Sequence, residues 1–238
     1  MIKIETLATM SPSQWEAVIK GMRNPMNSWD RSDSWKTHIE NPQTMNTADF
    51  EFFLGDNDYK LMTNLAEGGP VHAKYRRMMP IWVDITAPLY WFKEFDTYKV
   101  GTVANSCSTM HKIHAKEFTL DDFSTEHLTK RSLQRIYETI DELNYYRDIY
   151  INGGMDDNFD GTATVYEPKS KDAWWQMIQL LPSSYNQTRT VFLTYEVLVG
   201  IYRWRKDHKL DEWRIFCDWI KNELSCSELI TGEVEEDI

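Results

Sequence analysis

The alternation of apolar and polar residues predicts a chain in which helices predominate. Apolar residues recur three or four positions apart in several stretches, the spacing that places them on one face of an α-helix. These stretches are residues 11–22, 56–69, 118–153, 170–182 and 210–224. The first has the clearest start, because Ser11 can cap the helix, Pro12 suits its first turn and Gln14 completes a capping box.

Two of these helices carry long apolar faces that we expect to pack into a core. The residues expected to point inward are Trp15, Val18, Ile19 and Met22 in the first helix, and Leu133, Ile136, Tyr137, Ile140 and Leu143 in the longest. In the stretch 56–69 we expect Asp56 to be the cap and Gly68–Gly69 to end the helix.

Strands are predicted in fewer places. Residues 1–6 alternate well enough for a short first strand. Residues 79–86 place Ile81, Val83 and Ile85 on one face of a second strand.

The remaining segments complete the expected organisation. Residues 190–205 are apolar almost all round, which predicts a buried element. The polar stretches 23–50 and 153–168 predict a long ordered loop and a turn-rich connector. Together these features predict an α+β fold rich in helix, with one domain over residues 1–230 and an acidic tail over residues 231–238.

Composition and charge restrict the classes of function. The chain has 238 residues, a formal net charge of -11, 42% hydrophobic residues and ten tryptophans, which suffice for a sizeable core. The negative charge argues against nucleic-acid binding, which relies on Lys and Arg to neutralise phosphates, but it leaves room for a small anionic ligand in a local basic pocket. Three cysteines without paired spacing suit a reducing compartment. No stretch resembles a signal peptide or a membrane span, so we expect a cytoplasmic protein without a membrane partner.

Candidate metal ligands are sparse. Glycine-rich phosphate loops, G-x-S-x-G, H-E-x-x-H and zinc-spaced cysteine pairs are absent from the sequence. Cys107, His111 and His114 lie close together, and a fourth ligand from elsewhere would be needed to make them a metal site. A buried thiol beside two hydrogen-bonded histidines is the favoured interpretation, so no metal is predicted.

A polar segment follows the second predicted strand. Between residues 97 and 111 it offers the hydroxyls of Thr97, Tyr98, Thr102, Ser106, Ser108 and Thr109, the amide of Asn105, the cation of Lys99 and the flexible Gly101. Hydroxyls, backbone N–H groups and a lysine suit phosphate oxygens and a planar heterocycle. The alternative is an ordinary polar turn after a strand.

The segment "APLYWFKEFDTYKVGTVANSCSTM", residues 87–110, resembles the part of flavin-dependent thymidylate synthases that carries their signature, Arg-His-Arg-x-x-Ser-x-Asn-Glu-x-Ser-x-Arg. Lys93–Glu94 stands where that family has Arg-Gln. Upstream, His72 and Tyr75 resemble the family's histidine-aromatic segment. Downstream, Arg205 and Trp213 match its C-terminal block.

The sequence also departs from the signature. Arg-His-Arg becomes Thr97, Tyr98 and Lys99, the first Ser becomes Thr102, Asn-Glu becomes Ala104–Asn105, the second Ser becomes Cys107 and the last Arg becomes Thr109. In the C-terminal block the family's Asn-Ala-Arg reads Thr194, Tyr195 and Glu196. Exchanging arginine for threonine removes a bidentate phosphate contact, and Glu196 would repel an anion unless it accepts from a base amide or amine.

The resemblance implies a mixed or antiparallel sheet flanked by helices and an enzyme that methylates dUMP at C5. It implies FAD as cofactor, NADPH and methylenetetrahydrofolate as co-substrates, and a homotetramer whose active sites draw on several subunits. By resemblance, the cofactor-binding residues are Lys93, Thr97, Tyr98, Lys99, Thr102 and Asn105. The substrate-binding residues are Ser106, Ser108, Arg189, Glu196 and Arg205, and no residue is assigned to catalysis.

Two other functions stay open. A nucleotide-binding or regulatory homologue that lacks redox chemistry is favoured by the loss of Arg-His-Arg, and a structural protein would use the polar segment only for packing. Further basic residues could compensate for the lost arginines, among them Arg23, Arg76 and Arg77. Ion pairs are the alternative for the C-terminal arginines, with Arg205 bound to Asp207 or Glu212 and Arg203 bound to Glu196.

Overall fold

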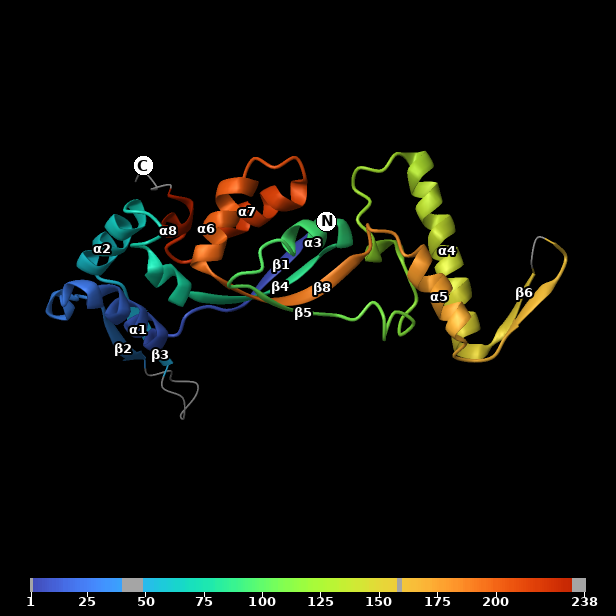
Figure 1. Ribbon diagram of the computed structural model, residues 1–238, viewed down its shortest axis with the longest axis horizontal. Helices are drawn as coiled ribbons and strands as arrows, with labels where there is room; N and C mark the ends of the chain where they lie inside the picture. The colour runs from blue at the N-terminus through green and yellow to red at the C-terminus, as the bar shows by residue number, and fades with distance from the viewer. Residues whose placement is uncertain (1, 40–48, 158–159, 233–238) are drawn as a thin grey trace. The chain divides into compact units, whose positions relative to one another are not determined.

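The computed structural model describes residues 2–39, 49–157 and 160–232 (Figure 1). The acidic tail lies outside the described residues apart from its first two positions. Internal contacts divide the chain into two compact units. The first unit comprises residues 1–3, 85–97 and 105–189, and the second comprises residues 4–84, 98–104 and 190–238.

Helices and strands alternate irregularly along the chain. The α-helices are α1 (Pro12–Arg23), α2 (Asp56–Glu67), α3 (Leu89–Phe95), α4 (Lys130–Asn152), α5 (Lys171–Leu180), α6 (Tyr195–Arg205), α7 (Asp211–Glu223) and α8 (Glu228–Thr231). The 3-10 helices are η1 (Asn24–Met26), η2 (Trp29–Arg31), η3 (Lys74–Met78) and η4 (Leu120–Asp122). The strands are β1 (Lys3–Ala8), β2 (Trp35–Ile39), β3 (Asp49–Phe53), β4 (Pro80–Pro88), β5 (Val103–Ser106), β6 (Gly154–Asp157), β7 (Ala163–Tyr166) and β8 (Asn186–Thr194). This α+β architecture confirms the predicted fold class.

Within the described ranges the strands form one four-stranded sheet and two antiparallel pairs. The sheet has the order β1-β4-β8-β5, while β2 pairs with β3 and β6 pairs with β7. Ile81, Val83 and Ile85 of β4 are fully buried and alternate with half-buried neighbours, which confirms the predicted period of two.

The start of α1 follows the sequence prediction closely. The Ser11 hydroxyl accepts from the Gln14 backbone N–H, and the Gln14 side chain accepts from the Ser11 N–H at 2.8 Å. Trp15, Val18 and Met22 are buried as expected. For α2 the predicted cap is displaced by one residue, because Gly55 occupies the cap position and Asp56 begins the helix.

A buried carboxylate ties together three segments of the second unit. Asp58 of α2 accepts from Arg23 Nε of α1 at 2.5 Å, and its second oxygen accepts from the Ser32 and Ser34 hydroxyls at 2.7 Å each. Burial alone would raise the pKa of Asp58, but hydrogen bonds from Ser34, Ser32 and Arg23 outweigh burial and hold that pKa below its ordinary value. The carboxylate therefore fixes the segment after α1 against α2.

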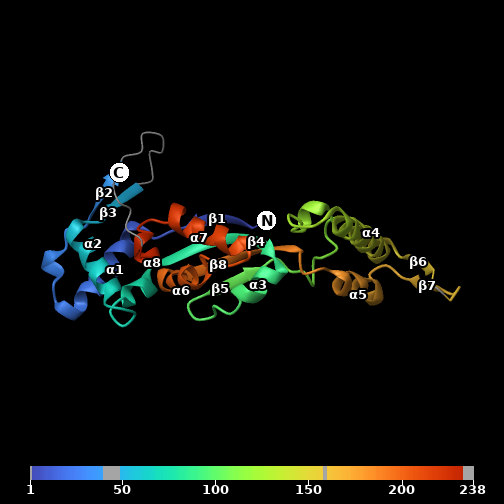
Figure 2. The ribbon, with the colours of Figure 1, turned by 90° about the horizontal axis from the view of Figure 1, so that it is seen from above.

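In the first unit α4 and α5 pack side by side, as Figures 1 and 2 show. Their shared core contains Ile113, Phe118, Phe123, Ile140, Leu143, Tyr146, Ile149, Ala173 and Met177. The β6–β7 pair continues from the end of α4 (Figure 2). The side-chain oxygen of Asn144 in α4 accepts from the Phe118 backbone N–H at 2.8 Å, and its amide nitrogen donates to the Phe118 carbonyl at 2.9 Å. Both backbone groups of that buried residue are therefore hydrogen-bonded.

Three sequence predictions are wrong in detail. Within residues 23–50, the described part contains η1, η2, β2 and the start of β3 as well as loop. Residues 153–168 contain β6 and β7 in place of a connector without strands. Residues 190–205 are two elements, because β8 ends at Thr194 and α6 begins at Tyr195. Apolar residues continue across the boundary between them, so the apolar pattern could not separate strand from helix.

None of the described helices combines the length and the apolar character that crossing a bilayer requires.

Candidate functional site

The residues predicted to bind cofactor and substrate fall into both compact units. The first unit contains Lys93, Thr97, Asn105, Ser106, Ser108 and Arg189, and the second contains Tyr98, Lys99, Thr102, Glu196 and Arg205. None of them lines the cavities described beside α1 in the second unit.

Arg205, at the end of α6, is held by two aromatic side chains. Its Nε donates to the Tyr98 hydroxyl at 2.9 Å, and its guanidinium carbon lies 4.6 Å from the centre of the Trp213 ring. Trp213 is fully buried in α7 and also contacts Tyr98 edge to face, with ring centres 6.0 Å apart. The structure thus brings Tyr98 and Arg205 together, and it adds Trp213 as the surface on which the guanidinium stacks.

Glu196, in the first turn of α6, lies beside a cation. Its carboxylate is 3.9 Å from the guanidinium of Arg77, which lies in η3. The side chain of Arg77 is mostly exposed, so this pair contributes little to stability. The carboxylate nevertheless has a cationic neighbour that sequence spacing did not reveal.

The segment 98–104 packs against the start of α6. A Cβ added at Gly101 would lie 3.0 Å from Val197 Cγ2 and 3.5 Å from the Thr194 hydroxyl. Thr102 Oγ1 is buried and makes no hydrogen bond to the residues that the structure describes. Lys99 and Val100 are exposed, and Val100 is 92% exposed. The hydroxyl of Thr102 therefore faces inward, whereas the ammonium of Lys99 is available to a ligand.

Gly101 adopts a backbone angle that other residues avoid, with φ of +81°. We expect Gly101→Ala to lower the free energy of unfolding by about 1–3 kcal/mol, because the new Cβ would combine left-handed strain with close contact to Val197. Urea denaturation measures this loss. The control is Gly161→Ala, which has the same sign of φ and no atom within 4 Å of the added Cβ. An equal loss in both variants would assign the effect to backbone strain alone.

Arg189, on β8, occupies the centre of a chain of contacts in the first unit. Its Nη1 donates to Asp96 at 2.7 Å and its Nε donates to the Gln187 side-chain oxygen at 2.9 Å. The guanidinium carbon lies 3.9 Å above the centre of the Phe92 ring. Gln187 in turn donates to the Cys107 carbonyl at 2.8 Å. Arg189 is thus fixed in orientation between the end of α3 and the residue that follows β5.

The remaining predicted residues of the first unit are exposed and partly engaged in local turns. The Thr97 hydroxyl donates to the Glu94 carbonyl at the end of α3. The Ser108 hydroxyl accepts from the backbone N–H groups of Met110 and His111. Lys93, Asn105 and Ser106 are exposed. This geometry supports the polar-turn interpretation for Thr97 and Ser108.

The three candidate metal ligands are spread over different environments. Among the described residues, no three His, Cys, Asp or Glu side chains come together in a group suited to a metal ion. Cys107 is exposed, and the favoured interpretation of a buried thiol is therefore wrong. His114 stacks on Tyr150 with ring centres 4.7 Å apart, and its Nδ1 is buried without a hydrogen-bond partner in the described part of the chain.

Sequence reasoning missed Asp96 and Gln187, which orient Arg189. Asp96 directly precedes the altered signature, but its partner lies 93 positions away, and spacing carries no signal over such a distance.

Comparison with solved structures shows a fold shared along the whole chain. A thymidylate synthase X from Helicobacter pylori, solved with FAD and dUMP, matches with a TM-score of 0.59 and 13% identity over 98% of each chain. A UMP/dUMP methylase, PolB from Streptomyces cacaoi, solved with 5-Br dUMP, matches with a TM-score of 0.58 and 13% identity over 93% of this chain and 88% of that one. No protein-family model and no curated protein matches the sequence. The chain therefore has a fold similar to that of thymidylate synthase X.

Proposed function

We propose that this chain is an enzyme of pyrimidine deoxynucleotide metabolism that transfers a one-carbon group to C5 of dUMP or a related base. The supporting observation is the fold likeness over nearly the full length to two proteins solved with dUMP or a brominated dUMP. In flavin-dependent thymidylate synthases that chemistry uses methylenetetrahydrofolate, FAD and NADPH in a homotetramer, and we extend the homotetramer to this chain.

Within the second unit, the cations that would contact the nucleotide are Lys99 and Arg205. Arg205 is preorganised by the Trp213 ring and the Tyr98 hydroxyl, which reduces the entropy lost when an arginine binds an anion. Lys99 is exposed and can approach a phosphate as a flexible point charge. Glu196 would accept from an N–H of the base, with Arg77 offsetting its charge.

The residues at the signature do not fit FAD as the family's Arg-His-Arg does. The Thr97 hydroxyl donates to the Glu94 carbonyl, and the Tyr98 hydroxyl accepts from Arg205 Nε. The hydroxyl of Thr102 is buried. Only Lys99 remains as a cation among the first three signature positions.

A second candidate function is a pyrimidine nucleotide-binding protein without redox chemistry. The specific observation that favours it is the contact between Tyr98 and Arg205, which directs a signature position toward the protein interior. In this case the fold would keep a nucleotide site and lose the chemical step.

We expect deoxyuridylate to bind the purified protein and Lys99→Gln to weaken that binding about tenfold or more, because a charge-assisted hydrogen bond to phosphate would be lost. Calorimetric titration measures the affinity. Lys209→Gln is the matched control, since it removes the same charge at another exposed lysine. No saturable binding of deoxyuridylate by the unmodified protein would contradict both candidate functions.

Two measurements separate the candidates once binding is established. Methylation at C5 breaks the C5–H bond, so deoxyuridylate carrying tritium at C5 would release the label to water during turnover with methylenetetrahydrofolate and NADPH. Flavin absorbance in the protein, or uptake of added FAD, together with tritium release supports the enzyme. Binding of deoxyuridylate by a colourless protein that neither takes up FAD nor releases tritium supports the nucleotide-binding candidate.

A further inference from the structure

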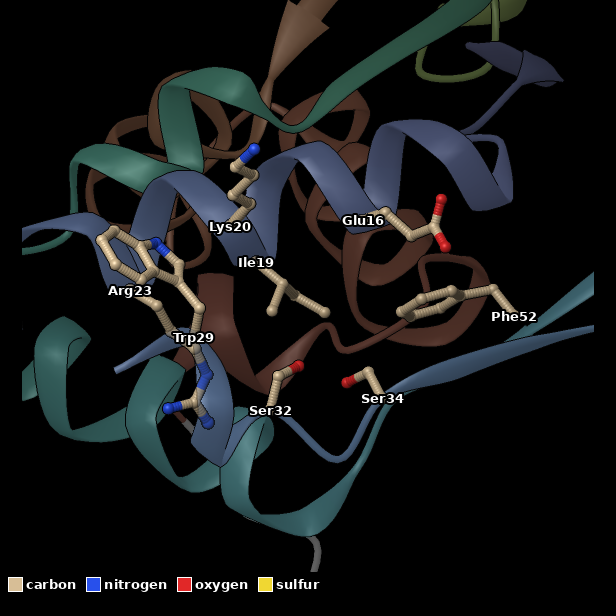
Figure 3. Close-up of a pocket in the computed structure, with 8 residues that line it drawn as sticks. All are labelled: Glu16, Ile19, Lys20, Arg23, Trp29, Ser32, Ser34 and Phe52. Carbon is tan, nitrogen blue, oxygen red and sulfur yellow. The ribbon is translucent and has the colours of Figure 1, made fainter. Parts of the chain in front are cut away.

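A cavity in the second unit lies in the N-terminal region that the resemblance does not cover. It has a volume of about 300 Å³ and lies beside α1, next to the segment 29–34 and β3. Its lining consists of Glu16, Ile19, Lys20, Arg23, Trp29, Ser32, Ser34 and Phe52. Figure 3 shows Ile19 and Phe52 facing one another above the hydroxyls of Ser32 and Ser34. This size and this mixture of aromatic and polar groups are typical of a small-molecule pocket.

The aromatic walls of the cavity are held in place by residues outside it. The indole N–H of Trp29 donates to the Asn24 side chain at 2.9 Å, which fixes a ring that is nevertheless 49% exposed. Phe52 stacks on Trp15, with ring centres 5.4 Å apart and an interplanar angle of 4°. Because neither ring has to be ordered when a ligand enters, a flat ligand could contact them at a low cost in entropy.

The polar edge of the cavity offers a donor beside an acceptor. The Nε of Arg23 donates to the Asp58 carboxylate, and its Nη1 donates to the carbonyl and the hydroxyl of Ser28. Its Nη2 makes no hydrogen bond to the residues that the structure describes. The Ser32 hydroxyl donates its proton to the other oxygen of Asp58, which leaves its own oxygen as an acceptor. Both groups are oriented by one carboxylate, so their relative positions are fixed.

Charge around the cavity is largely neutralised. Asp58 offsets Arg23, and Glu16 pairs with Lys36 at 2.6 Å. Lys20 extends its ammonium away from Ser32 and Ser34 in Figure 3. A neutral ligand with one donor and one acceptor therefore suits this edge better than an anion does.

We propose that this cavity binds a planar heterocycle that carries a lactam edge, the O=C–N–H arrangement present in uracil and hypoxanthine. The ligand carbonyl accepts from Arg23 Nη2, and the ring N–H donates to the Ser32 oxygen. The ring faces contact Trp29 and Phe52, and Ile19 contributes an apolar wall above the two serine hydroxyls. This site is separate from the one under the proposed function and does not depend on it.

The test is a calorimetric titration with free uracil and, as a matched ligand, 1,3-dimethyluracil, which keeps the ring and lacks both N–H groups. Uracil is expected to bind at least about fivefold more tightly than the dimethyl compound, because the Ser32 oxygen would otherwise be left without a partner. Trp29→Ala is expected to weaken uracil binding at least about fivefold through lost stacking. Trp175→Ala, which removes a partly exposed tryptophan from α5, should leave the affinity unchanged.

A further variant tests the hydrogen bond between the ligand and Ser32 at the polar edge of the cavity. Ser32→Ala should lower the affinity for uracil to that for 1,3-dimethyluracil, while circular dichroism shows whether the fold is retained through Ser34 and the backbone contacts to Asp58. Equal binding of both ligands, or tighter binding of benzoate, would overturn the lactam assignment. No binding of uracil, or binding that Trp29→Ala leaves intact, would overturn the site. Free uracil lacks a phosphate, and Trp29→Ala should leave the affinity for deoxyuridylate unchanged, so failure of this proposal and failure of the proposed function are distinguishable.

Discussion

Asp58→Ala is expected to lower the free energy of unfolding by about 3–5 kcal/mol, because it leaves the guanidinium of Arg23 buried without its carboxylate. The side chains of Arg23 and Asp58 are 4% and 0% exposed, so water cannot replace the lost partner. The Ser32 and Ser34 hydroxyls lose their acceptor in the same variant. For a chain of this length the loss corresponds to a fall in melting temperature on the order of 10 °C.

Urea denaturation and thermal unfolding measure this effect, and two variants show its cause. Asp141→Ala removes an exposed carboxylate from α4 and should change stability by no more than about 0.5 kcal/mol. The double variant Arg23→Met with Asp58→Leu should be more stable than Asp58→Ala, because no unpaired charge remains. A double variant as unstable as the single one would show that the hydroxyl contacts, and not the ion pair, dominate.

The same carboxylate gives stability a dependence on pH. Its pKa in the folded protein lies below the ordinary value of 3.8. Its contribution is therefore fully present above the unfolded-state pKa and is lost as pH falls through the lower, folded-state pKa. The difference in stability between the wild-type protein and Asp58→Ala should accordingly shrink as the solution is acidified below about pH 4.

Leu143→Ala is expected to destabilise the first unit by about 2–5 kcal/mol through the cavity it leaves in the core between α4 and α5. Leu143 is fully buried and belongs to a cluster that includes Phe118, Ile140 and Met177. Because the chain has two compact units, the loss should fall mainly on the amide hydrogens of α4 and α5. Hydrogen exchange followed residue by residue measures it.

The control for Leu143→Ala is an exposed residue of the same helix, α4. Tyr137 was predicted from sequence to share the inward face with Leu143, yet it is 43% exposed. Tyr137→Ala should therefore cost less than about 1 kcal/mol. If both variants lost equal stability, Tyr137 would have to be packed in solution and the described surface of α4 would be wrong.

Sequence reasoning predicted elements well where local chemistry decides them. The cap of α1 and the alternation of β4 follow from interactions within a few residues, and both are present. It failed where the deciding contacts are distant in sequence or where the apolar pattern fits both a strand and a helix. Apolar residues run across the boundary at Thr194 between β8 and α6, so the apolar pattern cannot distinguish the two elements. β6 and β7 are four residues each, too short for a clear period of two.

The candidate site shows the same limit. Composition indicated hydroxyls and cations in the segment after β4, but it could not show that Tyr98 meets Arg205 or that Asp96 meets Arg189, since those partners lie 107 and 93 positions apart. Burial of the Thr102 hydroxyl likewise depends on how residues 98–104 pack on α6.

The contacts of Arg189 bear on how this protein can diverge. Asp96 and Gln187 hold one guanidinium from two sides, and Phe92 covers its face, so loss of Arg189 alone would leave a carboxylate and an amide without their shared partner. Substitutions at these positions should therefore be correlated in evolution. Where Arg189 is replaced, we expect Asp96 to be replaced by a neutral residue. Among distant homologues, correlated replacement at positions 96, 187 and 189 would indicate this arrangement even where the signature residues are no longer present.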